Sequence, residues 1–314
     1  MSMQKEKVLL LGANGFLGSH VTDALIAEGF SVRAMDMFSD FKNARFNPSV
    51  DIEMVSGNFL NQADVEEAIG GVDYVIHLVT TTNPATAESD PLIDIDTNIR
   101  GSVELFQKIV ANGKIKKIIY SSSGGTVYGD QDVNHPISEL EHTWPVSPYG
   151  IGKLTIENYL HYFDKKFVQP YTVFRIANPY GERQPKVRKQ GVIPIFMDKI
   201  LNDEPITVLG DGEMVRDYIY VKDVAQVIAK SLKKELQHSI YNLGSGSGHS
   251  VNEIVAEIEK ATGKKAKIDY KPAPSTFVNF SVLDNTRCAK EFPEVTLTSL
   301  DIGIKHLIRE IESE

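Results

Sequence analysis

The chain has 314 residues, of which 42% are apolar and 24% charged, and its formal net charge is -9. This length fits one large domain or two closely joined domains, and the acidic balance argues against nucleic acid as the main ligand while leaving room for a small phosphorylated ligand. Cys288 is the only cysteine, so no internal disulfide can form. Because no apolar run approaches the roughly 18 residues of a membrane span and the polar N-terminus does not resemble a signal peptide, we expect a cytoplasmic enzyme or ligand-binding protein that does not associate with membranes.

The first predicted elements are a strand and a helix joined by a glycine-rich turn. Val8–Leu11 is an apolar run typical of a buried parallel strand, and Ser19–Gly29 has apolar residues at helical spacing. Glycines at 12, 15 and 18 lie between them in the spacing G-x-x-G-x-x-G, which differs from the G-x-G-x-x-G of the standard dinucleotide fingerprint. Such glycines permit a tight turn and close approach of the backbone to a pyrophosphate, and the helix N-terminus adds free N–H groups. We therefore predict a dinucleotide site, with a ligand-free turn as the alternative.

An acidic residue ends the second predicted strand. This strand covers Ser31–Met35, and Asp36 follows it directly. A carboxylate at this point can accept hydrogen bonds from the ribose hydroxyls of adenosine, and it repels a 2′-phosphate. Asp36 therefore favours NAD over NADP as the cofactor; the alternative is an aspartate that caps a turn.

The first half of the chain continues to alternate strands and helices. The strands are predicted at Ile52–Val55, Val72–Val79, Ile115–Ser121 and Tyr171–Ile176, and the helices at Ala63–Ile69, Pro91–Ala111 and Ser147–Phe167. This alternation is typical of an α/β fold with a Rossmann-type doubly wound parallel sheet, which we assign to an NAD-binding domain at residues 1–177. Ligands bind such sheets at the carboxyl ends of the strands. The polar residues that fall at those ends are the glycine turn, Asp36, Thr80–Thr82, Ser121–Ser123 and Asn178.

The pattern becomes mixed after Asn178. Helices are predicted at Val192–Leu201, Val224–Leu232, Val251–Thr262 and Leu300–Ile311, and strands at Ile206–Leu209, Tyr218–Val221 and Ser239–Leu243. These elements predict a smaller mixed α/β lobe at residues 178–314 that binds substrate and whose segments can interleave with the first domain. The polar and basic stretch Glu182–Gln190 is either a substrate loop or a solvated loop.

Tyr149 and Lys153 form a candidate acid–base pair. They lie four residues apart and share one face of a predicted helix. A cation beside a phenol favours the phenolate and lowers the pKa of the phenol below its ordinary value of about 10. Tyr149 could then take a proton from a sugar or alcohol hydroxyl. The alternative, a helical tyrosine with a surface lysine, is common, so the prediction depends on the dinucleotide turn and the serine run that accompany the pair.

Seven motifs together resemble those of the extended short-chain dehydrogenase/reductase family. They are Gly12-x-x-Gly15-Phe-Leu-Gly18, Asp36, Asn98-x-x-Gly101, Ser121-Ser-Ser-Gly-Gly-Thr-Val-Tyr128-Gly, Tyr149-x-x-x-Lys153, Arg175-x-x-Asn178-Pro-Tyr-Gly181 and Arg216-Asp-Tyr-Ile-Tyr-Val-Lys-Asp223. The chain is most similar to the NAD-dependent epimerase/dehydratase type, and within that type to nucleotide-sugar epimerases such as the UDP-glucose 4-epimerases. The resemblance covers almost the whole chain. It implies a 4-epimerase that acts on UDP-hexoses or UDP-N-acetylhexosamines through a transient 4-keto sugar, and a homodimer formed by the helices near residues 98–111 and 147–167.

The resemblance also implies roles for individual residues. NAD contacts are implied at Gly12, Asn14, Gly15, Phe16, Leu17, Gly18, Asp36, Asn58, Phe59, Leu78, Thr80, Asn98, Ser121, Tyr149 and Lys153, and substrate contacts at Asn178, Val192, Thr207, Leu209, Arg216 and Ser281, with no metal. In the implied mechanism Tyr149 removes the proton of the C4 hydroxyl, and Lys153 binds the nicotinamide ribose and lowers the pKa of Tyr149. A small residue at Ser281, where some epimerases have a bulky one, leads us to expect that UDP-N-acetylhexosamines are accepted along with, or in place of, UDP-hexoses.

Three positions depart from the family pattern. Gly124 stands where the family has a catalytic serine or threonine, which leaves Ser123 or Thr126 to hydrogen-bond the sugar oxygen. Pro274 stands at the position of a second diphosphate arginine, and cations from the stretch Arg183–Lys189 or Lys271 are the candidate substitutes. Asn58 replaces an aspartate beside the adenine, and its amide oxygen can still accept from the adenine amino group.

The residues before Val127-Tyr128 bear on the type of reaction. Family dehydratases carry Asp-Glu there and decarboxylases carry Ser-Glu, whereas this chain has Gly125 and Thr126. The lack of a carboxylate favours epimerisation or simple redox chemistry. A nucleotide-sugar reductase or dehydrogenase and a non-catalytic NAD-binding sensor therefore remain as alternatives to the epimerase.

Overall fold

Seven parallel strands form the main sheet of the protein. The structure is a computed structural model that describes residues 5–131, 135–184, 191–273 and 278–313. In sheet order the strands are β10 (Ile240–Leu243), β6 (Tyr171–Ile176), β5 (Lys117–Ser123), β4 (Tyr74–His77), β1 (Lys7–Leu11), β2 (Ser31–Asp36) and β3 (Ile52–Ser56). The strand order reverses between β1 and β4, which is the point where doubly wound sheets bind ligands.

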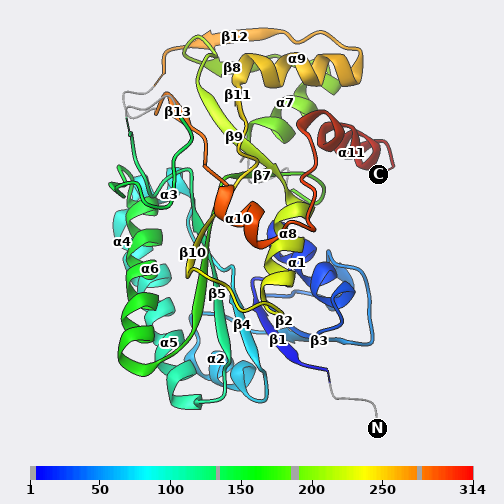
Figure 1. Cartoon of the computed structure of the whole chain (residues 1–314). Coiled ribbons are helices and arrows are strands. Elements are labelled where there is room, and N and C mark those ends of the chain that lie inside the picture. The colour runs from blue at the N-terminus through cyan, green and yellow to red at the C-terminus, as the bar shows by residue number, and fades with distance from the viewer. Residues whose placement is uncertain (1–4, 132–134, 185–190, 274–277, 314) are drawn as a thin grey trace.

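Helices cover both faces of this sheet (Figure 1). On one face α1 (Phe16–Ala27) packs beside α8 (Val221–Ser231), and on the other lie α2 (Gln62–Ile69), α5 (Arg100–Asn112) and α6 (Pro148–Phe167). Side chains of β1 alternate between the two cores: Val8 and Leu10 join the α1 and α8 side, whereas Leu9 and Leu11 join the other. This arrangement confirms the predicted α/β fold class.

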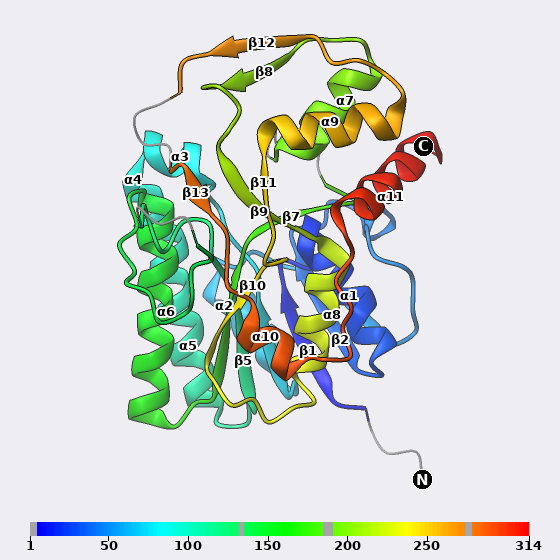
Figure 2. The same cartoon turned by 45° about the horizontal axis from the view of Figure 1, so that its top comes forward.

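A smaller lobe lies beyond the carboxyl ends of the main strands (Figure 2). Its strand β9 (Val215–Tyr220) pairs with β7 (Asn178–Tyr180), β11 (Gly248–Ser250) and β13 (Phe280–Ser281), while β8 (Ile206–Leu209) pairs with β12 (Ile268–Lys271). Helices α7 (Val192–Leu201), α9 (Val251–Thr262) and α11 (Leu300–Ser313) share a third apolar core with these strands. The lobe is therefore of mixed α/β type, as predicted.

The two predicted regions share the main sheet. Strand β10 comes from the second half of the chain and pairs with β6, and α8 packs against α1. The boundary between residues 177 and 178 stays a prediction. No helix among the described ranges is both long and apolar enough to cross a membrane.

The clearest departure from the predicted elements lies before α5. In place of one helix over Pro91–Ala111, the chain forms α4 (Pro91–Ile93), a π-helical segment η2 (Asp94–Ile99) and then α5. A short helix α3 (Pro84–Ser89) precedes them, and η1 (Phe41–Asn43) and α10 (Thr286–Glu291) complete the short elements. Buried hydrogen bonds from Asn98 and Thr82 to the Asp94 carboxylate hold the wider π turn. Such turns are frequent at functional sites.

Smaller departures concern the ends of strands. Strand β4 stops at His77 rather than Val79, because the chain then passes over the glycine turn, where a Cβ on Gly12 would lie 3.3 Å from the Val79 nitrogen. Strand β5 runs two residues beyond its predicted end, and Ser123 pairs with Ile176 of β6. The serine run is consequently fixed in the sheet, at its ligand-binding edge.

Candidate active site

The glycine turn leads directly into helix α1. Gly12 has φ = +85°, a left-handed conformation that favours glycine. A Cβ on Gly18 would lie only 2.0 Å from the Gly12 carbonyl oxygen, so α1 can pack on the turn only with glycine at this position. The N-cap residue Gly15 has no side chain to occupy the N–H groups of the first helical turn. Those donors fit the pyrophosphate of a dinucleotide.

Asp36 lies beside this turn at the end of β2. Its Oδ2 atom accepts a hydrogen bond of 2.8 Å from the Asn14 backbone N–H, and its Oδ1 atom accepts one of 2.8 Å from the Met37 N–H. The Asn14 side chain in turn accepts from the Arg45 N–H at 2.9 Å. The predicted cofactor residues Asn14 and Asp36 are thus in direct contact, and the carboxylate is fixed where a ribose could reach it.

Predicted cofactor residues also follow the ends of β3 and β4, while Phe16 and Leu17 begin α1 and Asn98 lies on η2. The side-chain oxygen of Asn58 accepts a hydrogen bond of 3.0 Å from the Leu60 N–H, and Phe59 is buried against the His77 ring. Thr80 bonds the Thr82 carbonyl at 3.0 Å. The side chains of Asn58 and Phe59 thus have contacts within the protein, and the predicted contact of Asn58 with adenine stays a prediction, since an amide oxygen can accept a second hydrogen bond.

Tyr149 and Lys153 meet on α6, next to the end of β5. The Lys153 ammonium donates to the Ser121 carbonyl at 2.8 Å and lies 5.7 Å from the centroid of the Tyr149 ring. Burial lowers the pKa of Lys153 to about 8. Burial, assisted by the negative charge of Asp94, raises the pKa of Tyr149 to about 12. In the protein alone the pKa of Tyr149 is thus raised, because burial of the phenol dominates; the effect of Lys153 on it stays a prediction.

Asp94 is a buried carboxylate of this site that the sequence did not reveal. It is 3% exposed and lines the same small pocket as Tyr149, Lys153 and Tyr120. The one available signal is its spacing, four residues before Asn98 in a predicted helix, which places both on one face. The hydroxyl of Tyr120 is buried there without a hydrogen-bond partner in the described part of the chain.

The serine run and the residues after it offer two hydroxyls of different accessibility. Ser123 is half-buried and its hydroxyl makes no hydrogen bond to any described residue, whereas Thr126 Oγ1 is fully buried with no partner among them. Gly124 is packed under Leu283, since a Cβ on it would lie 2.4 Å from Leu283 Cδ1. The space of the family hydroxyl is thus filled by Leu283, and Ser123 has the hydroxyl that a ligand can reach.

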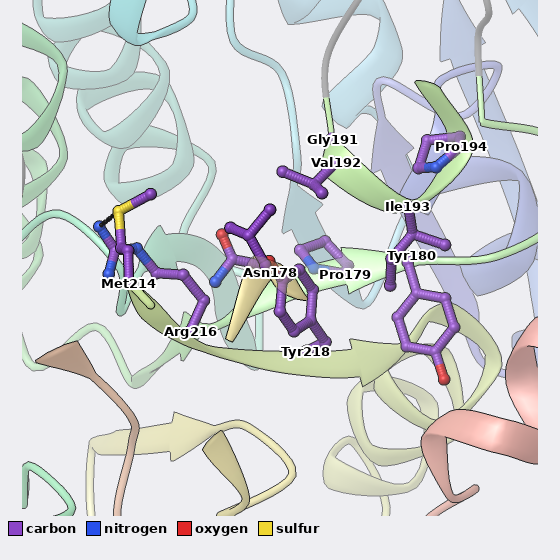
Figure 3. Close-up of a pocket in the computed structure, with 11 residues that line it drawn as sticks. Asn178, Pro179, Tyr180, Gly191, Val192, Ile193, Pro194, Met214, Arg216 and Tyr218 are labelled. Carbon is purple, nitrogen blue, oxygen red and sulfur yellow. Dashed lines mark hydrogen bonds between the residues drawn. The ribbon is translucent and has the colours of Figure 1, made fainter. Parts of the chain in front are cut away.

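A cavity of about 310 Å³ opens in the small lobe (Figure 3). It is lined from β7, from the start of α7, from β9 and from α9 by Asn178, Pro179, Tyr180, Gly191, Val192, Ile193, Pro194, Met214, Arg216, Tyr218 and Val251. Three predicted substrate residues, Asn178, Val192 and Arg216, therefore share one cavity. The other three do not line it: Thr207 and Leu209 lie on β8, and Ser281 is buried on β13 in register with Arg216.

Arg216 is the cation of this cavity. Its guanidinium donates to the carbonyls of Val215 at 2.8 Å and Val278 at 2.5 Å and contacts the Met214 sulfur at 2.7 Å (Figure 3). It forms no ion pair with any described carboxylate, and burial lowers its pKa. A buried guanidinium with only neutral acceptors retains its attraction for an anion.

The candidate substitutes for a second diphosphate cation are engaged or lie outside the described ranges. Arg183 pairs with Asp23 at 2.8 Å, and Lys271 lies 3.9 Å from Asp269. Lys186, Arg188, Lys189 and Pro274 fall outside the described residues. Among the described ranges no cluster of side chains suits a metal ion.

Comparison with known proteins places this geometry in a family. The model of the NAD dependent epimerase/dehydratase family matches residues 8–244. The dTDP-4-dehydro-6-deoxyglucose reductase of Escherichia coli is 34% identical over 99% of this chain and 99% of its own. The structure of a UDP-glucose 4-epimerase from Thermotoga maritima with UDP-glucose is 33% identical, has a TM-score of 0.90, and covers 98% of this chain and 99% of its own. A UDP-N-acetylglucosamine 4-epimerase from Methanobrevibacter ruminantium, in complex with UDP-N-acetylmuramic acid, is 28% identical with a TM-score of 0.90 over 99% of both chains.

The family match spans most of the candidate site. The matched residues include the glycine turn, Asp36, Tyr149, Lys153 and Arg216. The predicted cofactor, NAD, is confirmed by the family and by a neighbour of known structure that contains it. The chain therefore belongs to the NAD dependent epimerase/dehydratase family.

Proposed function

We propose that the protein is a nucleotide-sugar 4-epimerase that acts on UDP-hexoses or UDP-N-acetylhexosamines. The observation that carries this proposal is the Tyr149–Lys153 pair, bonded to the end of β5 through the Ser121 carbonyl, with no carboxylate at Gly125 or Thr126. An acid–base pair without a carboxylate at these two positions suits the removal of one proton from a sugar hydroxyl and its return to the same oxygen. The likeness to the Thermotoga maritima epimerase supports UDP as the nucleotide.

The residues around the glycine turn would hold the cofactor. The free N–H groups at the start of α1 suit its pyrophosphate, and Asp36 suits the adenosine ribose. Lys153, anchored by the Ser121 carbonyl, is positioned to donate to the other ribose. NAD, when bound, takes up a hydride from the sugar carbon and returns it.

The protein's own residues handle the proton. Tyr149 takes the proton of the C4 hydroxyl, and Ser123 donates a hydrogen bond to the same oxygen. When the 4-keto sugar is reduced on its other face, Tyr149 gives the proton back, so neither proton nor hydride is consumed. Because the Tyr149 pKa is about 12 in the protein alone, ligand binding has to stabilise the phenolate, and Lys153 is the cation of the chain nearest to it.

The lobe cavity would hold the nucleotide. Arg216 is suited to the diphosphate and Asn178 lies beside it, while Val192 offers an apolar wall for the base. Thr207 and Leu209 keep their predicted substrate contacts only if bound ligand extends beyond the cavity. Pro274, at the family position of the second diphosphate arginine, lies outside the described ranges.

Ser281 bears on the choice of sugar. It is 6% exposed, small, and adjacent in register to Arg216. We expect Ser281→Tyr to lose activity on UDP-N-acetylglucosamine at least tenfold more than on UDP-glucose, because a bulky ring removes the room for an acetamido group. Relative kcat/KM values for the two sugars measure this. Equal loss on both would contradict the assignment, and Ser281→Thr, which adds little volume, serves as the control.

A reductase is the second candidate function. It is favoured by the 34% identity over 99% of the chain to the Escherichia coli dTDP-4-dehydro-6-deoxyglucose reductase. Such an enzyme would use the same Tyr149 as an acid, delivering a proton to the keto oxygen. It would consume one hydride and one proton in each turnover, so it would need reduced cofactor from solution.

One experiment separates these functions. The purified protein is incubated without added cofactor with UDP-glucose and, separately, with UDP-N-acetylglucosamine, and proton NMR follows the anomeric signals. A new galacto signal supports epimerisation with retained NAD. If neither sugar changes, but dTDP-4-dehydro-6-deoxyglucose is reduced with stoichiometric oxidation of NADH or NADPH, the epimerase proposal is wrong and the reductase is supported.

We further propose that the protein forms a homodimer through α6 and the segment before α5. Apolar side chains exposed on this side of the subunit are Leu92, Ile95, Ile151, Tyr159 and Tyr162. Their spacing on α6 places three of them in one stripe. Sedimentation velocity should give a mass near twice that of the chain, and Ile151→Glu with Tyr159→Glu should reduce it to that of a monomer.

A further inference from the structure

Asp94 is an incompletely bonded carboxylate behind the Tyr149–Lys153 pair. Its Oδ1 atom accepts hydrogen bonds from Thr82 Oγ1 at 2.6 Å and from Asn98 Nδ2 at 2.8 Å. Its Oδ2 atom accepts none from the described residues. Unlike the Tyr120 hydroxyl, this oxygen is not fully enclosed, and Asp94 lines the pocket of Tyr149 and Lys153. A carboxylate held by neighbours through one oxygen and left free at the other is suited to a functional role in that pocket.

Gly152 allows this carboxylate to approach α6. A Cβ on Gly152 would lie 1.8 Å from Asp94 Oδ2, so any other residue at position 152 would displace the carboxylate. Gly152 immediately precedes Lys153, and both line the small pocket that also contains Asp94 and Tyr149. The contact therefore sets the negative charge against the helical turn that carries the proton-transfer pair.

The other titratable groups of the pocket carry little net charge. Tyr120 of β5 is neutral because burial raises its pKa well above the ordinary value, and His77 of β4 is neutral because burial lowers its pKa to about 3. Glu157 of α6 also faces Lys153, but Arg175 binds it through two nitrogens at 2.7–3.2 Å and offsets its charge. Asp94 and Lys153 are thus the two unbalanced charges near Tyr149.

The remaining charges on the elements around Asp94 are engaged away from the pocket. Asp96 of η2 and Arg100 of α5 pair with each other at 3.7 Å on the surface. On α5, Glu104 bonds Gln62 and Lys108 bonds Glu66. None of these three contacts includes Asp94 or Lys153.

We propose that Asp94 is a positioning residue that keeps Lys153 as an ammonium ion and Tyr149 as a phenol until cofactor and sugar bind. A buried anion attracts the cation and opposes a second anion nearby. Burial lowers the pKa of Lys153 to about 8, and Asp94, ahead of Glu157, opposes that fall. Asp94 also adds to the burial that raises the pKa of Tyr149. The inference deepens the proposed function, because it rests on Tyr149 and Lys153 as the proton-transfer pair.

Asp94→Asn tests this role without a substrate. Asparagine retains an oxygen that can accept from Thr82 and Asn98 but has no charge. The protein is prepared with lysine labelled with ¹³C at Cε, and the Lys153 resonance is assigned with Lys153→Arg and followed against pH. We expect the pKa of Lys153 to fall by about one unit. The matched control, Asp96→Asn on the same segment, should leave it unchanged.

A second variant covers the possibility that Asp94→Asn does not fold. Gly152→Ala keeps the charge but pushes the carboxylate away from the turn, so it should also lower the Lys153 pKa, by a smaller amount. A Lys153 pKa equal to that of the unmodified protein in either folded variant would overturn the proposal. Because this NMR measurement uses no sugar, a failure to epimerise UDP-sugars would count against the proposed function alone.

The pH dependence of turnover gives an independent measure. In the free enzyme the alkaline limb of kcat/KM reports loss of the Lys153 proton. Removal of Asp94 lowers the Lys153 pKa, so this limb should move to lower pH by about one unit in Asp94→Asn and stay in place in Asp96→Asn. A uniform loss of rate with an unmoved limb would assign Asp94 a purely structural role.

Discussion

The two ends of the candidate site are constructed differently. At the main-sheet end some polar side chains bond one another, as Asp94 does with Thr82 and Asn98. In the lobe cavity the guanidinium of Arg216 bonds only uncharged atoms among the described residues. Mutually bonded groups keep a fixed geometry for chemistry, whereas a cation without a counter-ion is available to an anionic ligand. We therefore expect changes at the first end to alter the rate and changes at the second to alter affinity.

The largest effect should come from Tyr149→Phe. Loss of the hydroxyl removes the only proposed proton acceptor, and we expect turnover to fall by about 1,000-fold or more. The fold and the cofactor should be retained, since no hydrogen bond of the Tyr149 hydroxyl holds the structure together within the described residues. Rates from proton NMR and NAD released on denaturation measure the two properties. A variant that keeps turnover would show that a different group acts as the base.

Arg216→Ala should instead weaken binding. A charge-assisted contact to a diphosphate is worth about 3 kcal/mol, so the Kd for UDP should rise about 100-fold while the NAD content stays constant. Isothermal titration calorimetry with UDP measures this. Arg100→Ala is the control, because its side chain is 67% exposed and distant from the cavity lining. A large loss of kcat with an unchanged Kd would remove the distinction between the two ends.

Gly18→Ala tests the fixed geometry of the cofactor end. The added methyl would lie 2.0 Å from the Gly12 carbonyl oxygen, which forces the turn and α1 apart. We expect a loss of about 2 kcal/mol in the free energy of unfolding, together with loss of retained NAD. Denaturant unfolding and NAD content provide the measurements. At Gly125 the nearest atom to an added Cβ is 4.0 Å away, so Gly125→Ala should leave stability unchanged.

The sequence predicted the end of the site that depends on local motifs. The glycine turn, Asp36 and the Tyr149–Lys153 spacing are each set by a few consecutive residues, and strand alternation was sufficient to place them at one sheet edge. The lobe cavity combines β7, α7 and β9, which are separated by long stretches of chain. Tertiary packing decides which of their side chains meet, and so Thr207 and Leu209 do not line the cavity with Arg216.

Burial was the second property that the sequence did not supply. A lysine beside a tyrosine lowers the tyrosine pKa only if burial does not destabilise the phenolate by more than the lysine stabilises it, and if no anion is near. In the folded chain desolvation and Asp94 reverse the sign for Tyr149. The packing around Gly124 could not be predicted from the sequence either. The side chain next to it belongs to Leu283, which follows more than 150 positions later, so no local spacing links the two residues.

The smallest predicted effect distinguishes the two candidate hydroxyls. Ser123→Ala removes the accessible hydroxyl, and we expect kcat to fall about tenfold through loss of one hydrogen bond to the sugar oxygen. Thr126→Val replaces a buried, unbonded hydroxyl with a methyl group of similar size, so kcat should change less than twofold and stability should be equal or higher. Thermal unfolding and NMR rates measure both. If Thr126→Val lost activity and Ser123→Ala kept it, the backbone at Gly124 would have to move on binding, and the cofactor end would not be the fixed region that its hydrogen bonds indicate.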